Sequence, residues 1–300
     1  MPDNNIPRIL IQPLKPAVIA GVGQTLPVLI RVQAPDAEPT AKAEHRPYHL
    51  ALVIDRSGSM SGPPLAEAVR CARHIVDQLQ ATDSAALIVF DDRVQTLLPA
   101  RPVADRKALH LALSRVQSGG STNLHGGWQA GADSLLPDAG QAALARVILL
   151  SDGNANAGNI TDTAAIAALC AQAAERSVTT STYGLGRELN EELMVEMARR
   201  GGGNHYYGDT AADLFEPFAE EFDFISALCA RQVRLSLAAA QWVRIQLLND
   251  YPVDGDAGIS LIRLPDIAFG AEAWAPGNCC RQSSPPRPPR ARRWPLAMPR

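Results

Sequence analysis

The first strongly apolar stretch of the chain ends in a group of oxygen-bearing side chains. From Leu50 to Ile54 every residue is apolar, with no alternation between apolar and polar positions. This pattern is typical of a strand in a parallel sheet that is covered on both faces. Asp55, Ser57 and Ser59 follow directly, with a glycine between the two serines. Because α/β sheets bind their ligands beyond the carboxyl ends of the strands, the sequence predicts a binding site here.

Strand patterns and helix patterns alternate from residue 48 to residue 229. Buried or apolar strands are predicted at 49–54, 85–90 and 146–150, and further strands at 178–183 and 204–207. The segment 93–98 could pair as a short hairpin arm beside the strand at 85–90. Helices are predicted at 63–80, 105–116, 124–136, 161–176, 190–199 and 211–229, of which the first and last show apolar residues on one face. This order favours an α/β fold, in which a Rossmann-like, doubly wound and mostly parallel sheet carries helices on both faces.

Both flanks of this region, which we place at residues 47–229, show strand patterns of their own. The N-terminal segment, 1–46, contains predicted strands at Arg8–Pro13 and Leu26–Gln33, followed by a polar linker. The C-terminal segment, 230–275, contains four more, at 231–237, 242–247, 259–264 and 267–274. The C-terminal segment is too small to bury much by itself. We therefore expect the two segments to pair in a small β-sandwich-like region.

The last residues, 276–300, differ from everything before them. They are rich in proline, contain six arginines and have no acidic residue. Proline is unfavourable in helices and in central strands, and no periodicity is visible. A polyproline II tail that docks in an aromatic groove is one interpretation. We favour a disordered or artefactual tail produced by a frame shift, because the change interrupts an apparent strand at 268–275, and we assign it no function.

Charge and cysteine usage restrict the partners and the compartment. The chain has 28 basic and 31 acidic residues; without the six tail arginines, residues 1–275 have 22 basic and 31 acidic residues, a formal charge of −9. This acidic body argues against a nucleic-acid partner. Five scattered cysteines fit a reducing compartment. Because no secretory signal and no apolar run of about 18–20 residues is visible, we expect a cytoplasmic protein without a membrane span.

Two further loops carry oxygen ligands. Thr122 follows the sequence Ser-Gly-Gly-Ser, and Asp152 follows the strand at 146–150. We expect three strand-end loops to bring Asp55, Ser57, Ser59, Thr122 and Asp152 to one edge of the sheet. Hard oxygen donors suit Mg²⁺, Mn²⁺ or Ca²⁺ rather than zinc. Two carboxylates neutralise such an ion and the hydroxyls add no charge, which leaves a position open for an outside oxygen ligand such as an Asp or Glu of a partner.

These five residues resemble the metal-ion-dependent adhesion site (MIDAS) of the von Willebrand factor type A (VWA) domain. The family motif is Asp-x-Ser-x-Ser, then a distant Thr and a distant Asp, and every position matches. The resemblance covers residues 48–225. It implies that the three hydroxyls coordinate a divalent cation, with Mg²⁺ preferred over Mn²⁺ or Ca²⁺, and that the two aspartates bind it directly or through water. The flanks are similar to those of bacterial single-chain relatives of the calcium-activated chloride channel regulator group, although the His-Glu-x-x-His motif of larger members is absent.

The resemblance implies a metal-dependent protein–protein interaction module that binds an acidic residue of a protein partner, and not an enzyme. The alternative is a Mg²⁺-dependent phosphoryl-transfer hydrolase with Asp55 as its nucleophile. Such chemistry needs an acid–base group and a positioned cation, yet position 57 is serine where a second carboxylate is expected, and the ligand loops contain no lysine. A third interpretation is an ion that only stabilises the fold. Asp and Ser are also common in turns and helix caps, so the first motif alone is a weak signal.

Other polar residues near predicted strand ends have simpler interpretations. His125 could face the metal, but we favour a place early in the following helix. His205 is expected to pack within a strand. Asp91 and Asp92 could line the rim of the site, but we favour a solvated turn. Gly184-Leu-Gly lacks the spacing and the later acid of a dinucleotide site.

Overall fold

Two compact units make up the structure, which is a computed structural model. One unit lies within residues 42–227, and the other combines residues 1–41 with residues 228–300. The structure describes residues 7–19, 23–36, 47–137, 144–186, 189–231, 233–240, 243–249, 251, 253–254 and 259–281.

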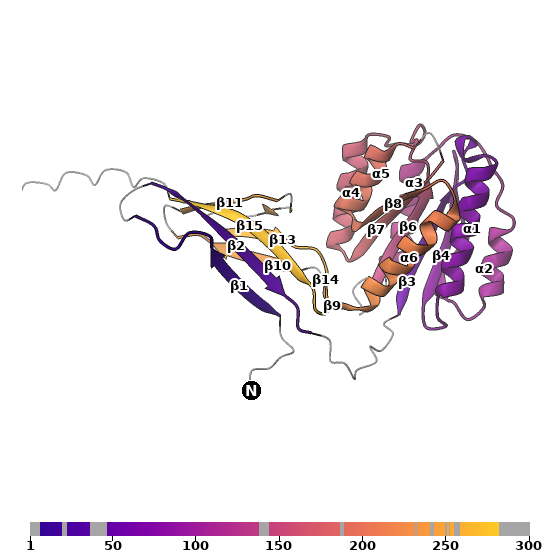
Figure 1. The fold of residues 1–300 in the computed structure, drawn as a ribbon. Coiled ribbons are helices and arrows are strands. Elements are labelled where there is room, and N and C mark those ends of the chain that lie inside the picture. The colour runs from indigo at the N-terminus through magenta and orange to yellow at the C-terminus, as the bar shows by residue number, and fades with distance from the viewer. Residues whose placement is uncertain are drawn as a thin grey trace, which may run out of the picture. The chain divides into compact units, whose positions relative to one another are not determined.

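The first unit is an α/β domain with a six-stranded sheet (Figure 1). Its strand order is β5-β4-β3-β6-β7-β8, and all neighbours are parallel except β5, which pairs antiparallel with β4. The strands are β3 (Tyr48–Asp55), β4 (Ser84–Phe90), β5 (Val94–Pro102), β6 (Leu144–Ser151), β7 (Val178–Leu185) and β8 (Gly202–Gly208). The helices are α1 (Pro63–Gln78), α2 (Arg106–Leu113), α3 (Leu124–Leu135), α4 (Thr163–Glu175), α5 (Glu191–Arg200) and α6 (Ala211–Ser226), with a short 3₁₀ turn, η1 (Gly58–Met60), after β3. The predicted doubly wound, mostly parallel sheet is confirmed.

Helices cover both faces of this sheet, which explains the uninterrupted apolar run in β3. Leu50, Leu52 and Ile54 pack in a core shared with α1, α2 and α6. Ala51 and Val53 point to the other face and pack in a core shared with α3, α4 and α5. Because successive residues of a strand alternate between faces, both sets of positions in this part of β3 face a hydrophobic core and are apolar.

Local signals place the starts of the helices. Pro63 and Pro64 open α1, where a missing backbone N–H costs nothing. The side chain of Asn190 caps α5 by accepting a hydrogen bond from the backbone N–H of Leu193 at 3.3 Å, as predicted. Among the helices of the described residues, none combines the length and the apolar character needed to cross a membrane.

The second unit consists of antiparallel strands from both ends of the chain. Its larger sheet has the order β1-β2-β15-β11, its smaller sheet the order β10-β13-β12, and β9 pairs with β14. The strands are β1 (Arg8–Pro13), β2 (Thr25–Gln33), β9 (Leu228–Ala230), β10 (Arg234–Ala238), β11 (Val243–Leu247), β12 (Val253–Asp254), β13 (Ile259–Arg263), β14 (Ile267–Ala268) and β15 (Glu272–Arg281). Val28, Ile30 and Val32 of β2 share one core with Leu235 of β10 and Ile262 of β13, so the two sheets enclose a sandwich-like core.

The C-terminal strand differs from the prediction. The strand expected at 267–274 is divided into β14 and β15, and β15 continues to Arg281, so the tail does not begin at residue 276. Pro276 lies inside this strand, opposite Leu29, and its carbonyl accepts a hydrogen bond from the N–H of Leu248 at 2.9 Å. Pairing on both sides, with β2 and β11, therefore keeps the segment extended despite the proline. Residues 282–300 of the predicted tail lie outside the described residues.

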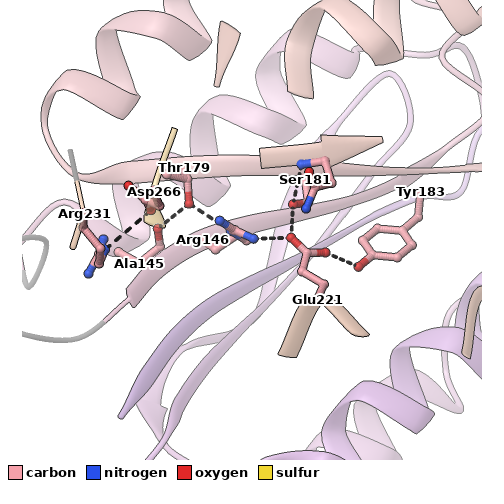
Figure 2. A network of polar contacts seen from close by, with 9 residues as sticks. Ala145, Arg146, Thr179, Ser181, Tyr183, Glu221, Arg231 and Asp266 are labelled. Atoms are coloured by element: carbon pink, nitrogen blue, oxygen red, sulfur yellow. Dashed lines mark hydrogen bonds and ion pairs between the residues drawn. The ribbon is translucent and has the colours of Figure 1, made fainter. Parts of the chain in front are cut away.

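A buried ion pair connects the last helix of the α/β domain to its sheet. Arg146 of β6 and Glu221 of α6 are both buried and form a charge-assisted hydrogen bond. Figure 2 shows further side chains of the sheet converging on this pair. The hydroxyls of Ser181 and Tyr183 each donate to Glu221 at 2.6 Å, and the Nε of Arg146 donates to the Thr179 hydroxyl at 2.9 Å. Burial and the neighbouring Glu221 carboxylate raise the pKa of Tyr183 well above its usual range, so the phenol remains a donor.

We expect Arg146→Met to lower the free energy of unfolding by about 3–5 kcal/mol, because it leaves the Glu221 carboxylate buried without its counter-charge. The double variant Arg146→Met/Glu221→Leu should lose less than Arg146→Met alone. Urea unfolding followed by far-UV circular dichroism at 222 nm measures both losses, since the described helices all belong to this domain. Arg199→Met is the matched control, because the Arg199–Glu196 pair is exposed and should contribute no more than about 1 kcal/mol. A loss for Arg146→Met no larger than the control's would contradict the prediction.

Candidate metal site at the carboxyl edge of the sheet

The strand order places a switch point between β3 and β6. The chain enters the sheet at β3, adds β4 and β5 on one side, and returns to add β6 on the other side. Connections on the two sides of a switch point leave in opposite directions, so a crevice opens outside the carboxyl ends of the two strands. Asp55 is the last residue of β3, and Asp152 directly follows β6. The sheet therefore brings these two carboxylates to the same edge, as predicted.

Asp55 is fully buried and accepts hydrogen bonds at both carboxylate oxygens. Its Oδ1 accepts from the backbone N–H of Ser57 at 2.8 Å. Its Oδ2 accepts from the hydroxyl of Ser151 at 2.6 Å, and that hydroxyl in turn accepts from the N–H of Gly153 at 2.9 Å. Ser151 was not among the predicted site residues. Its place as the last residue of β6, directly before Asp152, is the signal that could have identified it.

The surroundings of Asp55 make its ionised form less favourable than it is in water. Burial, and to a smaller extent the charge of nearby Asp152, raise the pKa of this carboxyl to about 6. The hydrogen bonds donated by Ser151 and Ser57 act in the opposite direction, because they stabilise the ionised form. Among the described residues, no basic side chain forms an ion pair with Asp55, so its carboxylate is a favourable ligand for a positive ion.

The first loop of the site follows β3, and its two serines lie side by side. The hydroxyl oxygens of Ser57 and Ser59 are 3.2 Å apart, with Ser57 buried and Ser59 exposed. The turn η1, which follows Ser57 and contains Ser59, ends at Met60, whose side chain is fully buried in the core beneath. Two hydroxyls at this separation can contact the same ion.

The loop that carries Thr122 does not follow a strand, which corrects the prediction. It joins α2 to α3 and reaches the sheet edge through two backbone hydrogen bonds with the first loop. The N–H of Gly58 donates to the carbonyl of Gly120 at 2.8 Å, and the N–H of Gly119 donates to the carbonyl of Arg56 at 2.7 Å. A Cβ atom at Gly119 would lie 1.9 Å from the Asp91 carboxylate, so any larger residue here would displace the Asp91 side chain.

Thr122 itself is buried. Its backbone is hydrogen-bonded to a residue of the third loop of the site, which follows β6. Its backbone N–H donates to Oδ1 of Asn156 at 2.8 Å, while its carbonyl accepts from the N–H groups of Asn156 at 3.2 Å and Ala157 at 3.1 Å. Asn156 therefore fixes the backbone of Thr122 from both sides. Sequence reasoning missed this residue, because the contact joins loops that lie far apart in the chain.

Asp152 is held by the backbone that surrounds it. Its Oδ1 accepts from the N–H of Asn154 at 3.0 Å, and its carbonyl accepts from the N–H of Asn190, the cap of α5, at 2.8 Å. Gly153 has a φ of +74°, and a Cβ atom there would lie 2.9 Å from the carbonyl oxygen of Asn190. Glycine is required at this turn, which lets α5 begin directly against the third loop.

Asp91 is not the solvated turn residue that we favoured. It is buried, and its Oδ2 lies 3.1 Å from the Nε of Arg56, the residue between Asp55 and Ser57. Its carbonyl accepts from the N–H of Asn123 at 2.8 Å. Asp91 thus connects the first loop to the second at the rim of the site. Asp92, by contrast, is exposed.

The residues brought together fit a hard divalent cation. Two carboxylates from β3 and β6 lie at one edge, and the loops that carry the three hydroxyls are hydrogen-bonded to each other and to the third loop. In the described part of the chain, no group of three or more His, Cys, Asp and Glu side chains could hold a metal ion. A metal site at this edge therefore depends on hydroxyl ligands, which suit Mg²⁺, Mn²⁺ or Ca²⁺.

The remaining residues singled out from the sequence lie in helices and strands or directly after them. His125 lies in the first turn of α3, and partial burial lowers its pKa. Nδ1 of His205 in β8 is 2.9 Å from the Thr182 hydroxyl. Gly184 is part of β7, and Gly186, with a φ of +102°, follows its end.

The fold and this edge define a doubly wound α/β domain with a polar site at its switch point. The model of the von Willebrand factor type A domain matches residues 49–221, and the chain belongs to this family. Domains of this family generally mediate metal-dependent protein–protein interactions.

Individual relatives resemble the chain at low identity. It is 24% identical to the uncharacterized protein sll0103 of Synechocystis sp. over 236 residues, which cover 75% of this chain and 55% of that protein. The chain thus spans about half the length of this curated relative. A von Willebrand factor type A structure from Catenulispora acidiphila superposes with a TM-score of 0.69 at 19% identity, covering 95% of this chain and 67% of that one. Proximal thread matrix protein 1 from the mussel byssus, with a zinc-occupied MIDAS motif, superposes with a TM-score of 0.50 at 14% identity, covering 64% of this chain and 50% of that one.

The raised pKa of Asp55 predicts how the stability of metal-free protein depends on pH. In the folded state this carboxyl takes up a proton near pH 6, but in the unfolded chain only near pH 4. Between these values the folded state binds more protons, so the contribution of Asp55 to the free energy of unfolding increases as the pH falls from 7 to 4. The full difference is on the order of 2–3 kcal/mol.

The measurement is urea unfolding in chelator at pH 7 and at pH 4.5, for wild type and Asp55→Asn. The neutral variant should be more stable than wild type at pH 7 and lose this advantage at the lower pH. A difference between the two proteins that does not change with pH would contradict the prediction.

Proposed function

We propose that Asp55, Ser57, Ser59, Thr122 and Asp152 form a MIDAS-type site, through which the chain binds an acidic residue of a protein partner by way of a divalent cation. The observation that carries the proposal is the convergence of three loops at the switch point of the sheet, joined by hydrogen bonds between their backbones. Membership of the VWA family supports the same function.

Each residue has a distinct part in the proposed site. The hydroxyls of Ser57, Ser59 and Thr122 hold the cation without adding charge, and Asp55 and Asp152 balance its charge directly or through water. Ser151 orients Asp55 by donating to its Oδ2. When bound, the cation supplies a positively charged, Lewis-acidic position that accepts a carboxylate oxygen from outside.

Mg²⁺ is the ion that we expect in this site, with Mn²⁺ and Ca²⁺ as alternatives. The donors are all oxygen atoms, and only two of them belong to charged side chains. The zinc-occupied MIDAS motif of proximal thread matrix protein 1 shows that in that protein a softer ion enters such a site. The titration below therefore includes zinc.

The surroundings of Asp55 support a binding role over a phosphoryl-transfer role. A nucleophilic carboxylate must present a free oxygen to the substrate. Asp55 is fully buried, and both of its oxygens accept hydrogen bonds from neighbouring loops. We therefore propose an interaction module and not an enzyme.

The cytoplasmic location and the grouping with bacterial relatives of the calcium-activated chloride channel regulators remain predictions from the sequence.

We expect Mg²⁺, Mn²⁺ or Ca²⁺ to raise the unfolding temperature of metal-stripped wild type saturably, because a ligand of the native state stabilises it by about 2.7 kcal/mol at a hundredfold excess over its Kd. Asp152→Asn and Ser57→Ala should each remove most of this shift. Differential scanning calorimetry of the full chain measures it, with zinc as a fourth ion.

Asp92→Asn is the matched control, since Asp92 is an exposed carboxylate next to the site but not among the proposed ligands. It should keep the wild-type shift. The proposed site is overturned if none of the ions shifts the wild type, or if Asp152→Asn and Ser57→Ala respond like the control.

Asn156→Ala tests the positioning of Thr122. Loss of this side chain removes the acceptor for the Thr122 N–H and loosens a ligand without changing the ligand set. We expect Mg²⁺ affinity to fall about 10- to 100-fold, as is typical for residues that orient a ligand. Isothermal titration calorimetry measures the affinity, and Asn156→Asp, which keeps an acceptor oxygen, should recover part of it. Unchanged affinity in Asn156→Ala would show that Thr122 needs no such support.

A further inference from the structure

A groove lies beside the proposed cation site, between α1 and the end of α2. It has a volume of about 250 Å³. Its lining includes Leu65, Ala66, Val69 and Arg73 of α1, Leu113 at the end of α2, and Ser114 and Val116 just beyond it. Leu65 and Leu113 are buried, whereas Val69 and Val116 are half-buried. Aliphatic side chains therefore form part of the lining, beside the polar groups of Arg73 and Ser114, and the groove is partly open to solvent.

The same two chain segments carry ligands of the proposed site. Gly62, which also lines the groove, is three residues beyond Ser59, and Val116 precedes Thr122 by six residues. Between them, the hydroxyls of Ser61 and Ser118 lie 3.4 Å apart, so the two segments are close where they leave the groove. A short peptide that contacts Ser59 can therefore continue directly over the groove.

We propose that this groove binds an aliphatic side chain of the same partner segment whose acidic residue reaches the cation, and that Arg73 at its rim binds a second acidic residue. The inference rests on the proposed function, which it deepens by defining the partner as an acidic peptide segment with one aliphatic anchor. A groove of about 250 Å³ is smaller than pockets for drug-sized ligands, at about 300–1,000 Å³, and suits one or two side chains.

The charge near the groove favours an acidic partner. Arg73 is exposed and forms no ion pair with any described residue, whereas Arg70, one turn earlier on α1, pairs with Glu67 and lies over the Phe215 ring. Arg115, next to the lining residue Val116, is exposed as well and likewise has no ion-pair partner in the described part of the chain. Residues 1–275 are acidic as a whole, but the unpaired arginines beside the groove create a local positive field that attracts carboxylates.

The experiment selects random linear peptides displayed on phage against the immobilised full chain in Mg²⁺, with elution by chelator. Wild type, Ala66→Trp, Arg73→Glu and Asp152→Asn are compared. Ala66 is exposed, so tryptophan there fills the groove without entering the core. Ala168→Trp is the matched control, because Ala168 is an exposed alanine on α4, a helix that packs on the other face of the sheet.

Chelator-eluted peptides from wild type should share an acidic residue, an aliphatic residue at a fixed distance from it, and a second acidic residue. Selection on Ala66→Trp should lose the aliphatic preference, and selection on Arg73→Glu should lose the second acid, while Ala168→Trp matches wild type. For a synthetic peptide of the selected sequence, exchange of the aliphatic residue for alanine should weaken binding to wild type roughly 10- to 100-fold in fluorescence anisotropy. The same exchange should have little effect on Ala66→Trp.

The possible failures are distinguishable. Metal-dependent peptides that share an acidic residue, but show the same sequence preferences on wild type and Ala66→Trp, overturn the groove and leave the proposed function intact. A second acid that persists on Arg73→Glu overturns the role of Arg73. If wild type yields no chelator-eluted peptides beyond those of Asp152→Asn, the proposed function fails, and the groove proposal fails with it.

Discussion

A buried carboxylate at the end of a central strand determines the arrangement of the surrounding loops. Asp55 is fully buried, and removal of its charge from water is unfavourable unless donors or a cation replace the lost hydration. The Ser57 N–H shapes the first loop around one oxygen of Asp55, and the Ser151 hydroxyl ties β6 to the other. The interaction that lets Asp55 remain charged thus also draws the first and third loops together.

The two hydrophobic cores beneath these loops fix the positions from which the loops begin. β3 lies between two hydrophobic cores, so its register is set on both faces, and a shift by one residue would exchange the two sets of side chains. Asp55 consequently emerges at one defined position, and Met60 fixes the turn that follows. A ligand site on loops depends on such support, because loops that lack buried anchors sample many conformations.

The sequence was sufficient where local pattern decides structure, and insufficient where distant segments meet. The apolar run in β3 and the Asn190 cap of α5 could be predicted, since each depends on residues close in the chain. The burial of Asp91 could not, because it requires Arg56 from another loop and a glycine at position 119. Nor could the strand through Pro276, which exists because β2 and β11 pair on either side of it.

Overall charge and local charge act in opposite directions in the proposed interaction. The chain has a formal charge of −3 and repels an acidic partner weakly at long range, and at physiological ionic strength this repulsion is screened beyond about 8 Å. Recognition of a carboxylate then depends on short-range positive charge, supplied by the cation and by Arg73. Added salt should therefore weaken the long-range repulsion more than the contacts at the site, so encounter with an acidic peptide should become faster, not slower, as salt is raised from a low concentration.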